Sequence, residues 1–427
     1  MNAPGSGSTT RADVVVVGGG IVGRSVASAA ARRGMSVIVV EPGGTTFGTS
    51  SANAGHLVPS HRVPFAAPGM VRAGLHSLRT RDGAFAIAPR AALGLTPWLW
   101  RFARSSTAAN VQRGVPALRH LLDATLDEID RLQRAGLRFD HAAGGILQVA
   151  SSARGLDELR HEADDWGQWG VRVEELDGDA LRAEEPLVRG GVRGAVRLVD
   201  DGRFDPALLL AAVTDEGARH GVVPYDARVA RIEVRRARSA RVHTSQAVLD
   251  ARRVVVAAGV WTPALCRPLG ARLPIVPARG NSVTLPGAPL PSSPMLLHEQ
   301  RLALSPLARG LRLTGGFRLT TPGDRAVDSR KGQQLVARAG EVLQLPPSLS
   351  AENYWTGLRP ATPDGLPVLG ELPGAEAVVV ACGHGMLGST TGPGTGEVVA
   401  ALLAGEELPF DAAVVAPGRF GRKGSGR

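Results

Sequence analysis

Runs of valine and other apolar residues predict three strands that are buried on both faces. One run occupies residues 14–17 and is followed by three consecutive glycines, and similar runs stand at residues 253–258 and 377–381. Unbroken apolar runs of this length are typical of parallel strands that helices cover on both sides. Because the runs lie far apart in the sequence, one sheet built from them requires a second domain inserted between its strands.

A strand–helix–strand unit occupies residues 12–41. After the first strand, an alanine-, serine- and valine-rich segment at residues 21–33 predicts a helix that ends at Gly34. Residues 36–40 then predict a second β-branched strand, which Glu41 closes. These features together form a complete βαβ unit of the kind that binds nucleotides.

Three glycines lie where this unit would hold a pyrophosphate. In the pattern Gly18-x-Gly20-x-x-Gly23, Gly18 permits a tight turn, Gly20 lets the backbone approach a phosphate, and Gly23 lets the helix pack on the strand. Glu41 is placed to accept hydrogen bonds from an adenosine ribose, and its charge disfavours a 2′-phosphate. The unit predicts a dinucleotide site but does not distinguish FAD from NAD.

The segments between the three strands have a different pattern. Leucine and isoleucine recur at helical spacing over residues 118–132, which predicts an amphipathic helix ended by Gly136. Shorter apolar runs at residues 145–149, 282–285, 302–305 and 311–315 predict strands of a mostly antiparallel sheet. The chain is therefore predicted to be α/β, with a Rossmann-like nucleotide domain and an inserted α+β domain.

The composition excludes several classes of protein. The 427 residues are 44% hydrophobic and 21% charged, which is typical of a globular chain of two or three domains. Cys266 and Cys382 lack metal-ligand spacing, so we expect no metal site and a reducing compartment. The net charge of +10 comes almost wholly from arginine, and the basic run at residues 228–241 contains no aromatic residue. We interpret this run as a solvated hairpin and expect no nucleic-acid partner.

No apolar run approaches the length of a membrane span, and residues 1–11 lack the apolar core of a signal peptide. We therefore predict a cytoplasmic protein with disordered tails at residues 1–10 and 418–427. Residues 97–104 combine aromatic residues with arginines. We favour a core segment with a basic outer face, and the alternative is a peripheral contact with the inner face of the cell membrane.

Four further motifs follow the glycine turn in order. They are SSANAGH at residues 50–56, VVVAAGVWT at 254–262, WTGLRPATPDG at 355–365 and GHGMLG at 383–388. In this order and spacing, residues 13–408 resemble the FAD-dependent glycine/D-amino-acid oxidase family. Within that family the chain is most similar to the bacterial D-amino-acid dehydrogenase branch.

The resemblance implies a non-covalently bound FAD on a Rossmann-like domain of the glutathione-reductase type. It places the adenine end of the FAD on residues 18–41, with Val229 beside the adenine. The loop at 50–56 would lie beside the isoalloxazine ring, and backbone N–H groups of residues 383–387 would face the N1 edge of that ring. Donors at that edge would stabilise the negative charge of the reduced ring. The expected cofactor-binding residues are Gly18, Gly20, Ile21, Val22, Gly23, Glu41, Ser50, Ser51, Asn53, Ala54, Gly55, Val229, Gly259, Gly383, Gly385, Met386 and Leu387.

The same resemblance implies one residue at the substrate. The arginine of the GLRP motif, Arg359, would bind the substrate carboxylate as a fork, a task that suits a planar guanidinium. His56 and His384 are the next polar candidates: either could donate a hydrogen bond to the flavin or the substrate, and the alternative is a structural histidine. Some oxidases of the family add a tyrosine on a strand of the substrate domain, but residues 298–303 contain none, and Gln300 or Arg301 is a candidate replacement.

The expected activity is the oxidative deamination of a D-amino acid to a 2-oxo acid and ammonia. A hydride would pass from Cα to flavin N5, and a quinone or oxygen would then accept the electrons. The alternatives are a related amine oxidoreductase that acts on hydroxy-D-proline, glycine or sarcosine, and a flavin-binding protein without turnover. We expect residues 11–60, 196–272 and 355–415 to form the FAD domain and residues 61–195 and 273–354 to form the substrate domain.

Overall fold

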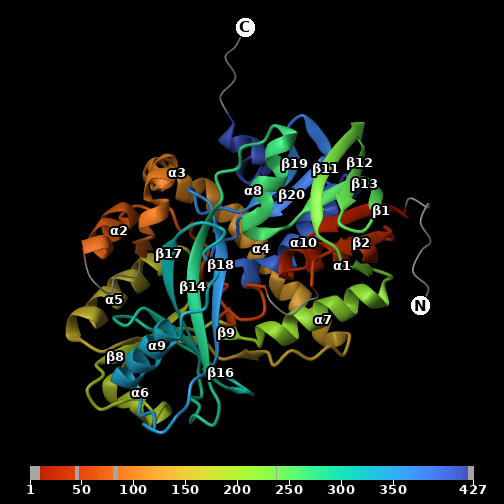
Figure 1. The fold of residues 1–427 in the computed structure, drawn as a ribbon. Helices are drawn as coiled ribbons and strands as arrows, with labels where there is room; N and C mark the ends of the chain where they lie inside the picture. The colour runs from red at the N-terminus through yellow and green to blue at the C-terminus, as the bar shows by residue number, and fades with distance from the viewer. Residues whose placement is uncertain (1–9, 44–47, 80–84, 237, 422–427) are drawn as a thin grey trace.

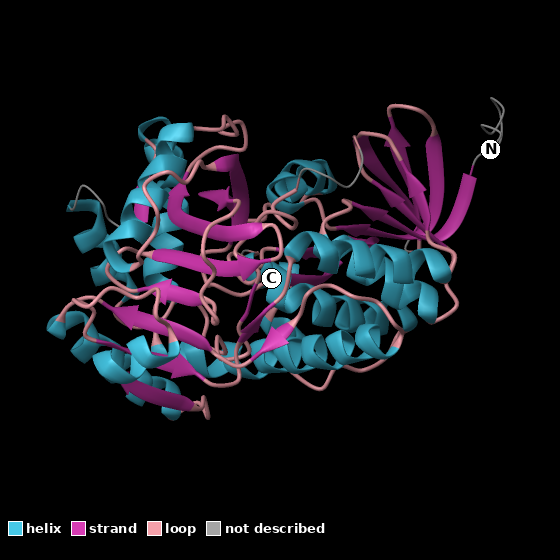
Figure 2. Cartoon of the chain, turned by 90° about the horizontal axis from the view of Figure 1, so that it is seen from below, coloured by secondary structure: helices cyan, strands magenta, loops and turns pink. Residues whose placement is uncertain are grey.

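The computed structural model describes residues 10–43, 48–79, 85–236 and 238–421. Its two large sheets lie on opposite sides of the molecule, and long helices pack along the first of them (Figures 1 and 2). The first sheet has eight strands and the second has nine. The predicted α/β fold with an inserted domain is confirmed.

The first sheet brings together the three apolar runs. Its central strands are β1 (Thr10–Val17), β2 (Val37–Val40), β13 (Val248–Val256) and β20 (Ala375–Cys382). β1 pairs in parallel with both β2 and β13, and β13 pairs in parallel with β20. Three distant segments therefore form one sheet, as the apolar runs predicted. The remaining strands are β10 (Val223–Tyr225), β11 (Val229–Arg236), β12 (Ser239–Thr244) and β19 (Val368–Leu372).

Four helices pack closely beside this sheet. They are α1 (Ile21–Arg32), α4 (Ala108–Arg134), α7 (Pro206–Arg219) and α10 (Gly388–Ala404). The predicted helix at residues 118–132 is part of α4, which begins ten residues earlier and continues through Pro116. A Cβ on Gly394 of α10 would lie 2.1 Å from the carbonyl oxygen of Leu121, so this glycine lets α10 approach α4 closely.

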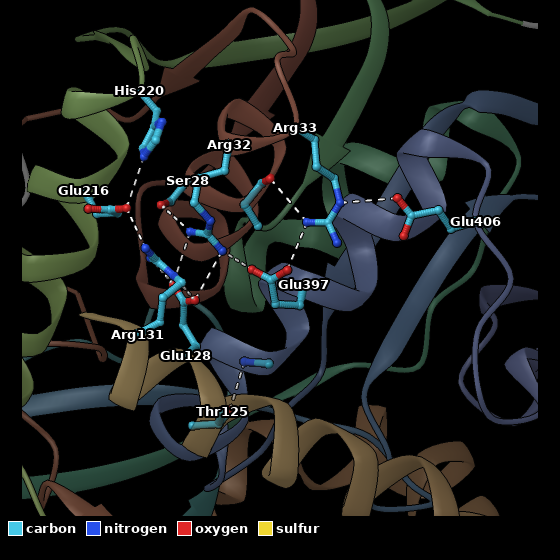
Figure 3. A network of polar contacts seen from close by, with 12 residues as sticks. Ser28, Arg32, Arg33, Thr125, Glu128, Arg131, Glu216, His220, Glu397 and Glu406 are labelled. Atoms are coloured by element: carbon cyan, nitrogen blue, oxygen red, sulfur yellow. Dashed lines mark hydrogen bonds and ion pairs between the residues drawn. The ribbon is translucent and has the colours of Figure 1, made fainter. Parts of the chain in front are cut away.

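A buried ion-pair network joins these helices (Figure 3). The Glu128 carboxylate, 6% exposed, accepts hydrogen bonds from Arg32 of α1 and from Arg131. Arg131 also donates to Glu216 of α7, and Arg32 contacts Glu397 of α10. Removing one member would leave a buried charge without its partner, so the network fixes how the four helices meet.

The second sheet is mostly antiparallel, as predicted. It contains β18 (Glu352–Ala361), β14 (Val276–Leu285), β17 (Gly310–Leu319), β16 (Leu302–Leu307), β15 (Met295–Leu297), β6 (Ile146–Ala150), β8 (Gly194–Leu198), β7 (Val173–Asp177) and β4 (Phe85–Ile87). Leucines and valines on one side form a core with α9 (Ser329–Val342). The opposite side carries Ser282, Thr284, Ser305, Arg312 and Thr314, which we call the polar face.

The other elements connect or cover the two sheets. A three-stranded sheet contains β3 (His56–Leu57), β9 (Gly202–Arg203) and β5 (Ala142–Ala143). The remaining α-helices are α2 (Met70–Arg79), α3 (Ala92–Ser105), α5 (Ala153–Gly167), α6 (Gly178–Glu184) and α8 (Thr262–Cys266). In the described part of the chain, no helix is both long and apolar enough to cross a membrane.

The predicted domain boundaries and tails fall at the following places in the structure. The domain boundaries at 195/196 and 354/355 fall inside β8 and β18, two strands of the second sheet. Part of segment 61–195, helix α4, packs on α10. We expected disordered tails at residues 1–10 and 418–427. In the structure residue 10 lies in β1, and residues 418–421 lie in or beside the 3₁₀ helix Pro417–Phe420. The rest of both tails lies outside the described residues.

The basic run at residues 228–241 forms the β11–β12 hairpin, as we interpreted it. Its cations have local partners, since Glu233 pairs with Arg231, Arg235 and His243. The segment 97–104 lies in α3, which buries Leu95, Trp98 and Phe102 and leaves Trp100 60% exposed. The favoured interpretation, a core segment with a basic outer face, fits this placement.

Candidate functional site

The glycine turn has the shape that the motif requires. Gly18 has φ +112°, and a Cβ on it would lie 2.5 Å from the carbonyl oxygen of Ala257. A Cβ on Gly23 would lie 1.9 Å from the carbonyl oxygen of Gly18. Both glycines are therefore needed for α1 to pack against β1 and β13.

Polar groups around the turn fit the adenosine diphosphate part of FAD. The N–H of Gly19 donates to Glu41 Oε2 (2.8 Å), and the N–H of Ile21 donates to Ser50 Oγ (3.0 Å). Burial raises the pKa of Glu41 and lowers that of Arg24, whose buried Nε has no hydrogen-bond partner among the described residues. A phosphate or ribose hydroxyl would complete this set of donors and acceptors. Arg24, a cation in the first turn of the helix after the glycines, was not predicted as a site residue.

The other expected cofactor residues lie around the first sheet. Val22 packs beside the core of that sheet, and Val229 begins β11 and packs on it. Gly259 has φ +54°, and its carbonyl oxygen lies 3.1 Å from Cys382 Sγ. Ser51 Oγ donates to the carbonyl oxygen of Gly48.

The loop at residues 50–56 is tied to two distant elements. The Asn53 amide donates to Ser389 Oγ at the start of α10 (2.7 Å), and Thr49 Oγ1 donates to the carbonyl oxygen of Leu358 in β18 (3.1 Å). The N–H of Gly55 donates to Asn53 Oδ1, and Gly55 has φ +74°. Ala54 lies within this loop, half-buried. The loop thus stands where the first sheet, α10 and the second sheet meet.

The start of α10 contributes backbone donors at the same place. Gly383 (φ +86°) and Gly385 (φ +55°) turn the chain, and the N–H of Gly385 donates to the carbonyl oxygen of Pro360 (2.9 Å). Leu387 is the N-cap of α10 and makes no side-chain capping bond, while Met386 is 53% exposed. The first N–H groups and the positive end of the helix dipole are therefore available to an anionic group.

Arg359 lies deep in the molecule, with part of its side chain accessible to solvent. Its Nη1 donates to the carbonyl oxygen of Gly316 (2.8 Å), and no acidic side chain of the described residues pairs with it. Burial lowers the pKa of Arg359 to about 10, so the guanidinium stays charged at neutral pH. An unpaired cation in such a place calls for an anionic ligand.

Two glycines make room for this guanidinium. Gly280 of β14 pairs with Gly357 of β18, and a Cβ on Gly280 would lie 2.2 Å from Arg359 Nη1. A Cβ on Gly357 would fall on the ring of Trp355, which lies 1.8 Å from that position. Arg359 and Trp355 therefore fold over neighbouring glycines on the sheet.

Both predicted histidines donate their ring proton to a group of the protein. His56 Nε2 lies 3.0 Å from the carbonyl oxygen of Leu304, which only accepts, so His56 donates through Nε2. His384 Nε2 lies 2.9 Å from Thr395 Oγ1, whose own proton goes to the carbonyl oxygen of Thr391, so His384 also donates through Nε2. Burial lowers the pKa of each ring to about 4. Both rings are neutral at pH 7 and keep only Nδ1, an acceptor.

The suggested replacements for the missing tyrosine lie elsewhere. Gln300 Nε2 donates to Glu341 of α9, on the apolar side of the second sheet, and Arg301 lies beside a surface pocket with Glu158 of α5. Ala303, in contrast, stands opposite Thr314 on the polar face. Both residues thus have polar neighbours other than Arg359, and the suggestion that one of them supplies a second carboxylate ligand stays a prediction.

A second buried arginine, which no motif predicted, lies on the polar face. Arg312 is 5% exposed and donates to Thr284 Oγ1 (2.9 Å) and to the carbonyl oxygen of Asn53 (3.3 Å). Ser282 Oγ likewise donates to the carbonyl oxygen of Ala52 (2.9 Å). The polar face is therefore held against the loop at residues 50–56. The alternation of Arg312 and Thr314 with leucines was the available signal.

A dinucleotide unit beside a second sheet that carries Arg359, a guanidinium without an acidic partner among the described residues, fits an oxidoreductase with a dinucleotide cofactor. The model of the FAD-dependent oxidoreductase family (DAO) matches residues 13–402, and the chain belongs to this family. The protein is thus an FAD-dependent oxidoreductase, and the cofactor and enzyme class that the motifs implied are confirmed.

The chain is also similar to individual members of this family. The chain is 33% identical over 408 residues to a D-amino acid dehydrogenase of Methylobacterium nodulans, covering 92% of this chain and 95% of that protein. It is 32% identical to a D-amino acid dehydrogenase of Cereibacter sphaeroides, covering 96% and 97%. Its structure is similar to glycine oxidase from Geobacillus kaustophilus, with a TM-score of 0.73, 26% identity and coverage of 96% and 99%.

Proposed function

We propose that this enzyme oxidises a D-amino acid to an imino acid, which water then hydrolyses to a 2-oxo acid and ammonia. The observation that carries the proposal is the Arg359 guanidinium, which lies deep in the molecule without an acidic partner among the described residues. The similarity to D-amino acid dehydrogenases supports the choice of substrate. An amino-acid carboxylate suits a forked guanidinium that is partly shielded from water.

In this mechanism the chain binds, orients and shields the substrate. Bound FAD would lie along residues 18–41 and the loop at 50–56, and it supplies the hydride acceptor. Arg359 would hold the carboxylate, and the Trp355 ring lies over the neighbouring Gly357. The neutral His56 contributes an acceptor at Nδ1 on the edge of the loop. The N–H groups at the start of α10 would stabilise negative charge on the flavin ring.

The decisive experiment is anaerobic mixing of the purified holoenzyme with panels of D- and L-amino acids. We expect at least one D-amino acid to bleach the flavin absorbance at a rate more than about tenfold that of its L-isomer, because Arg359 and the ring fix which Cα–H faces the flavin. Bleaching by L-isomers alone, or by no amino acid, would contradict the proposal.

The same panel separates the related amine substrates. The structural similarity to a glycine oxidase makes glycine, sarcosine and hydroxy-D-proline the second candidates. Bleaching by these amines without bleaching by D-amino acids would favour them. Mixing the reduced enzyme with a soluble quinone or with oxygen then identifies the electron acceptor, for which we propose a quinone.

We also propose that the protein is cytoplasmic and that α3 contacts the inner face of the membrane. Leu93 is 93% exposed and Trp100 60% exposed on this helix, and Arg101 and Arg104 lie beside Trp100 around a cavity of about 1250 Å³. Exposed aromatic and aliphatic side chains flanked by arginines suit an anionic lipid surface.

Flotation with liposomes tests this contact. We expect the protein to float with anionic vesicles and not with zwitterionic ones, and Trp100→Ser to lower the bound fraction at least about threefold. Trp261→Ser is the matched control, because Trp261 is also exposed (46%) but lies outside α3. Equal loss in both variants, or no flotation of the wild type, would exclude the contact.

A further inference from the structure

Three polar side chains next to the loop at residues 50–56 form a continuous hydrogen-bonded chain. Ser60 Oγ donates to Asp201 Oδ2 (2.7 Å), and the Ser60 N–H donates to Asp201 Oδ1 (3.0 Å). Ser60 Oγ also lies 3.1 Å from His61 Nδ1. When Asp201 is ionised, the Ser60 proton is given to Asp201, so His61 donates to Ser60 through Nδ1–H. In that state His61 Nε2 is an unprotonated acceptor.

The position of His61 links this chain to the candidate site. It lies four residues after β3, on a segment that begins with His56 bonded to β16. The segment ends at Phe65, whose ring centroid lies 5.4 Å from that of Phe317. Phe317 follows Gly316, whose carbonyl oxygen accepts the hydrogen bond from Arg359. His61 is half-buried and lies near His56. Part of its side chain is therefore accessible to a ligand beside this segment.

We propose that His61, Ser60 and Asp201 form a proton relay that deprotonates the substrate's ammonium group before hydride transfer. This inference rests on the amino-acid oxidation proposed above. An amino acid at neutral pH carries an ammonium group, since its pKa is about 8 or higher. Only the neutral amine has the lone pair that forms the C=N bond as the hydride leaves.

The relay moves one proton and no electrons. The ammonium N–H bond breaks as His61 Nε2 takes the proton, and the His61 Nδ1–H bond breaks as Ser60 Oγ takes the next one. The Ser60 O–H bond breaks as the proton reaches Asp201 Oδ2. His61 ends neutral with its proton on Nε2, and Asp201 ends as the uncharged acid. His61 is the catalytic residue, while Ser60 and Asp201 act through it.

The electrostatics support this direction of transfer. Burial raises the pKa of Asp201 to about 7. The charge of Asp200 adds to this rise, whereas the hydrogen bonds from Ser60 and the charge of Arg62 lower the pKa. Burial lowers the pKa of His61 to about 4, and the nearby His56 lowers it further. The proton is therefore more stable on Asp201 than on the His61 ring. Below pH 7, Asp201 is already protonated and the relay is blocked.

The test compares Asp201→Asn with the wild type in anaerobic flavin reduction across pH 6–10. In the wild type we expect the reduction rate to rise through about pH 7 as Asp201 ionises. In Asp201→Asn and Ser60→Ala we expect a loss of on the order of 100-fold at pH 7. The rate should recover toward the wild-type value as the pH rises to about 9, where more of the free amine is present and Arg359, with a pKa of about 10, is still mostly charged.

Asp200→Asn is the matched control, because Asp200 is the adjacent carboxylate and pairs with the exposed Arg172. We expect this variant to keep the wild-type rate at pH 7 and above, with the rise in rate shifted only to slightly lower pH, because Asp200 is one cause of the raised pKa of Asp201. An unchanged profile in Asp201→Asn, or a rate lowered equally at every pH, would overturn the relay. A wild type that no amino acid bleaches would instead overturn the proposed function.

Nitrogen NMR of the histidine rings gives a second measurement that does not depend on turnover. We expect His61 to carry its proton on Nδ1 in the wild type above pH 7, with His61→Gln identifying the signal. In Asp201→Asn, the new amide would donate to Ser60, which would then donate to Nδ1 and place the proton on Nε2. The same tautomer in both proteins would contradict the relay even without a known substrate.

Discussion

Arg359→Lys is expected to raise the KM for the best amino-acid substrate by a factor on the order of tens, because an ammonium does not fork onto a carboxylate. Arg359→Gln should cost more. Removing one partner of a shielded charge pair costs about 2–5 kcal/mol, or about 30- to 4,000-fold in affinity. Steady-state kinetics with a dye acceptor, and titration with a non-reacting carboxylate analogue, measure both changes.

The control is Arg318→Lys. Arg318 lies on β17, close in sequence to Gly316, but it is paired with Asp324 (2.7 Å) and is 39% exposed. Its replacement should change KM less than about twofold, because exposed ion pairs contribute little. If Arg359→Lys kept the wild-type KM, Arg359 would not be the carboxylate ligand.

Gly23→Ala is expected to yield a protein that loses its FAD during purification. The new Cβ would lie 1.9 Å from the carbonyl oxygen of Gly18, an atom of the backbone that does not rotate away. Helix α1 would have to move off β1 and β13, and the turn that holds the pyrophosphate would move with it. Overpacking of this kind also costs about 1–3 kcal/mol of stability. The ratio of flavin to protein absorbance measures the loss of cofactor.

Gly340→Ala provides the comparison. Gly340 also lies inside a helix, α9, but a Cβ on it would meet no atom within 4 Å. This variant should keep full FAD content and gain up to about 1 kcal/mol of stability, since alanine favours a helix over glycine. Equal FAD content in the two variants would show that close packing at Gly23 is not required for binding.

Local patterns carried much of the prediction of the fold. The strand at residues 14–17, the glycine turn and the helix at 21–33 follow from steric rules that act over a few residues. The parallel arrangement of the three apolar runs was also predictable, because only a sheet buried on both faces accommodates them. The start of α4 was not predicted, because polar residues and Pro116 precede the regular leucine spacing and tertiary packing stabilises that part of the helix.

The candidate site was predictable only in part. Motifs identified Arg359, the loop at 50–56 and the turn at 383–387. They did not reveal that Arg359 lacks an acidic partner among the described residues, or that Gly280 makes room for it. Hydrogen bonds to Leu304 and Thr395 set the tautomers of His56 and His384, and no local pattern announces such partners.

The sequence by itself determined the nucleotide-binding unit, the cofactor class and the arginine of the GLRP motif, because each depends on residues close together in the chain. Only the tertiary structure decided which side chains meet around the loop at residues 50–56. Asp201 reaches Ser60 because β9 pairs with β3, and Arg312 reaches Asn53 because the polar face packs on the loop. Contacts over such separations depend on how whole elements pair, and the spacing of residues along the chain does not encode them.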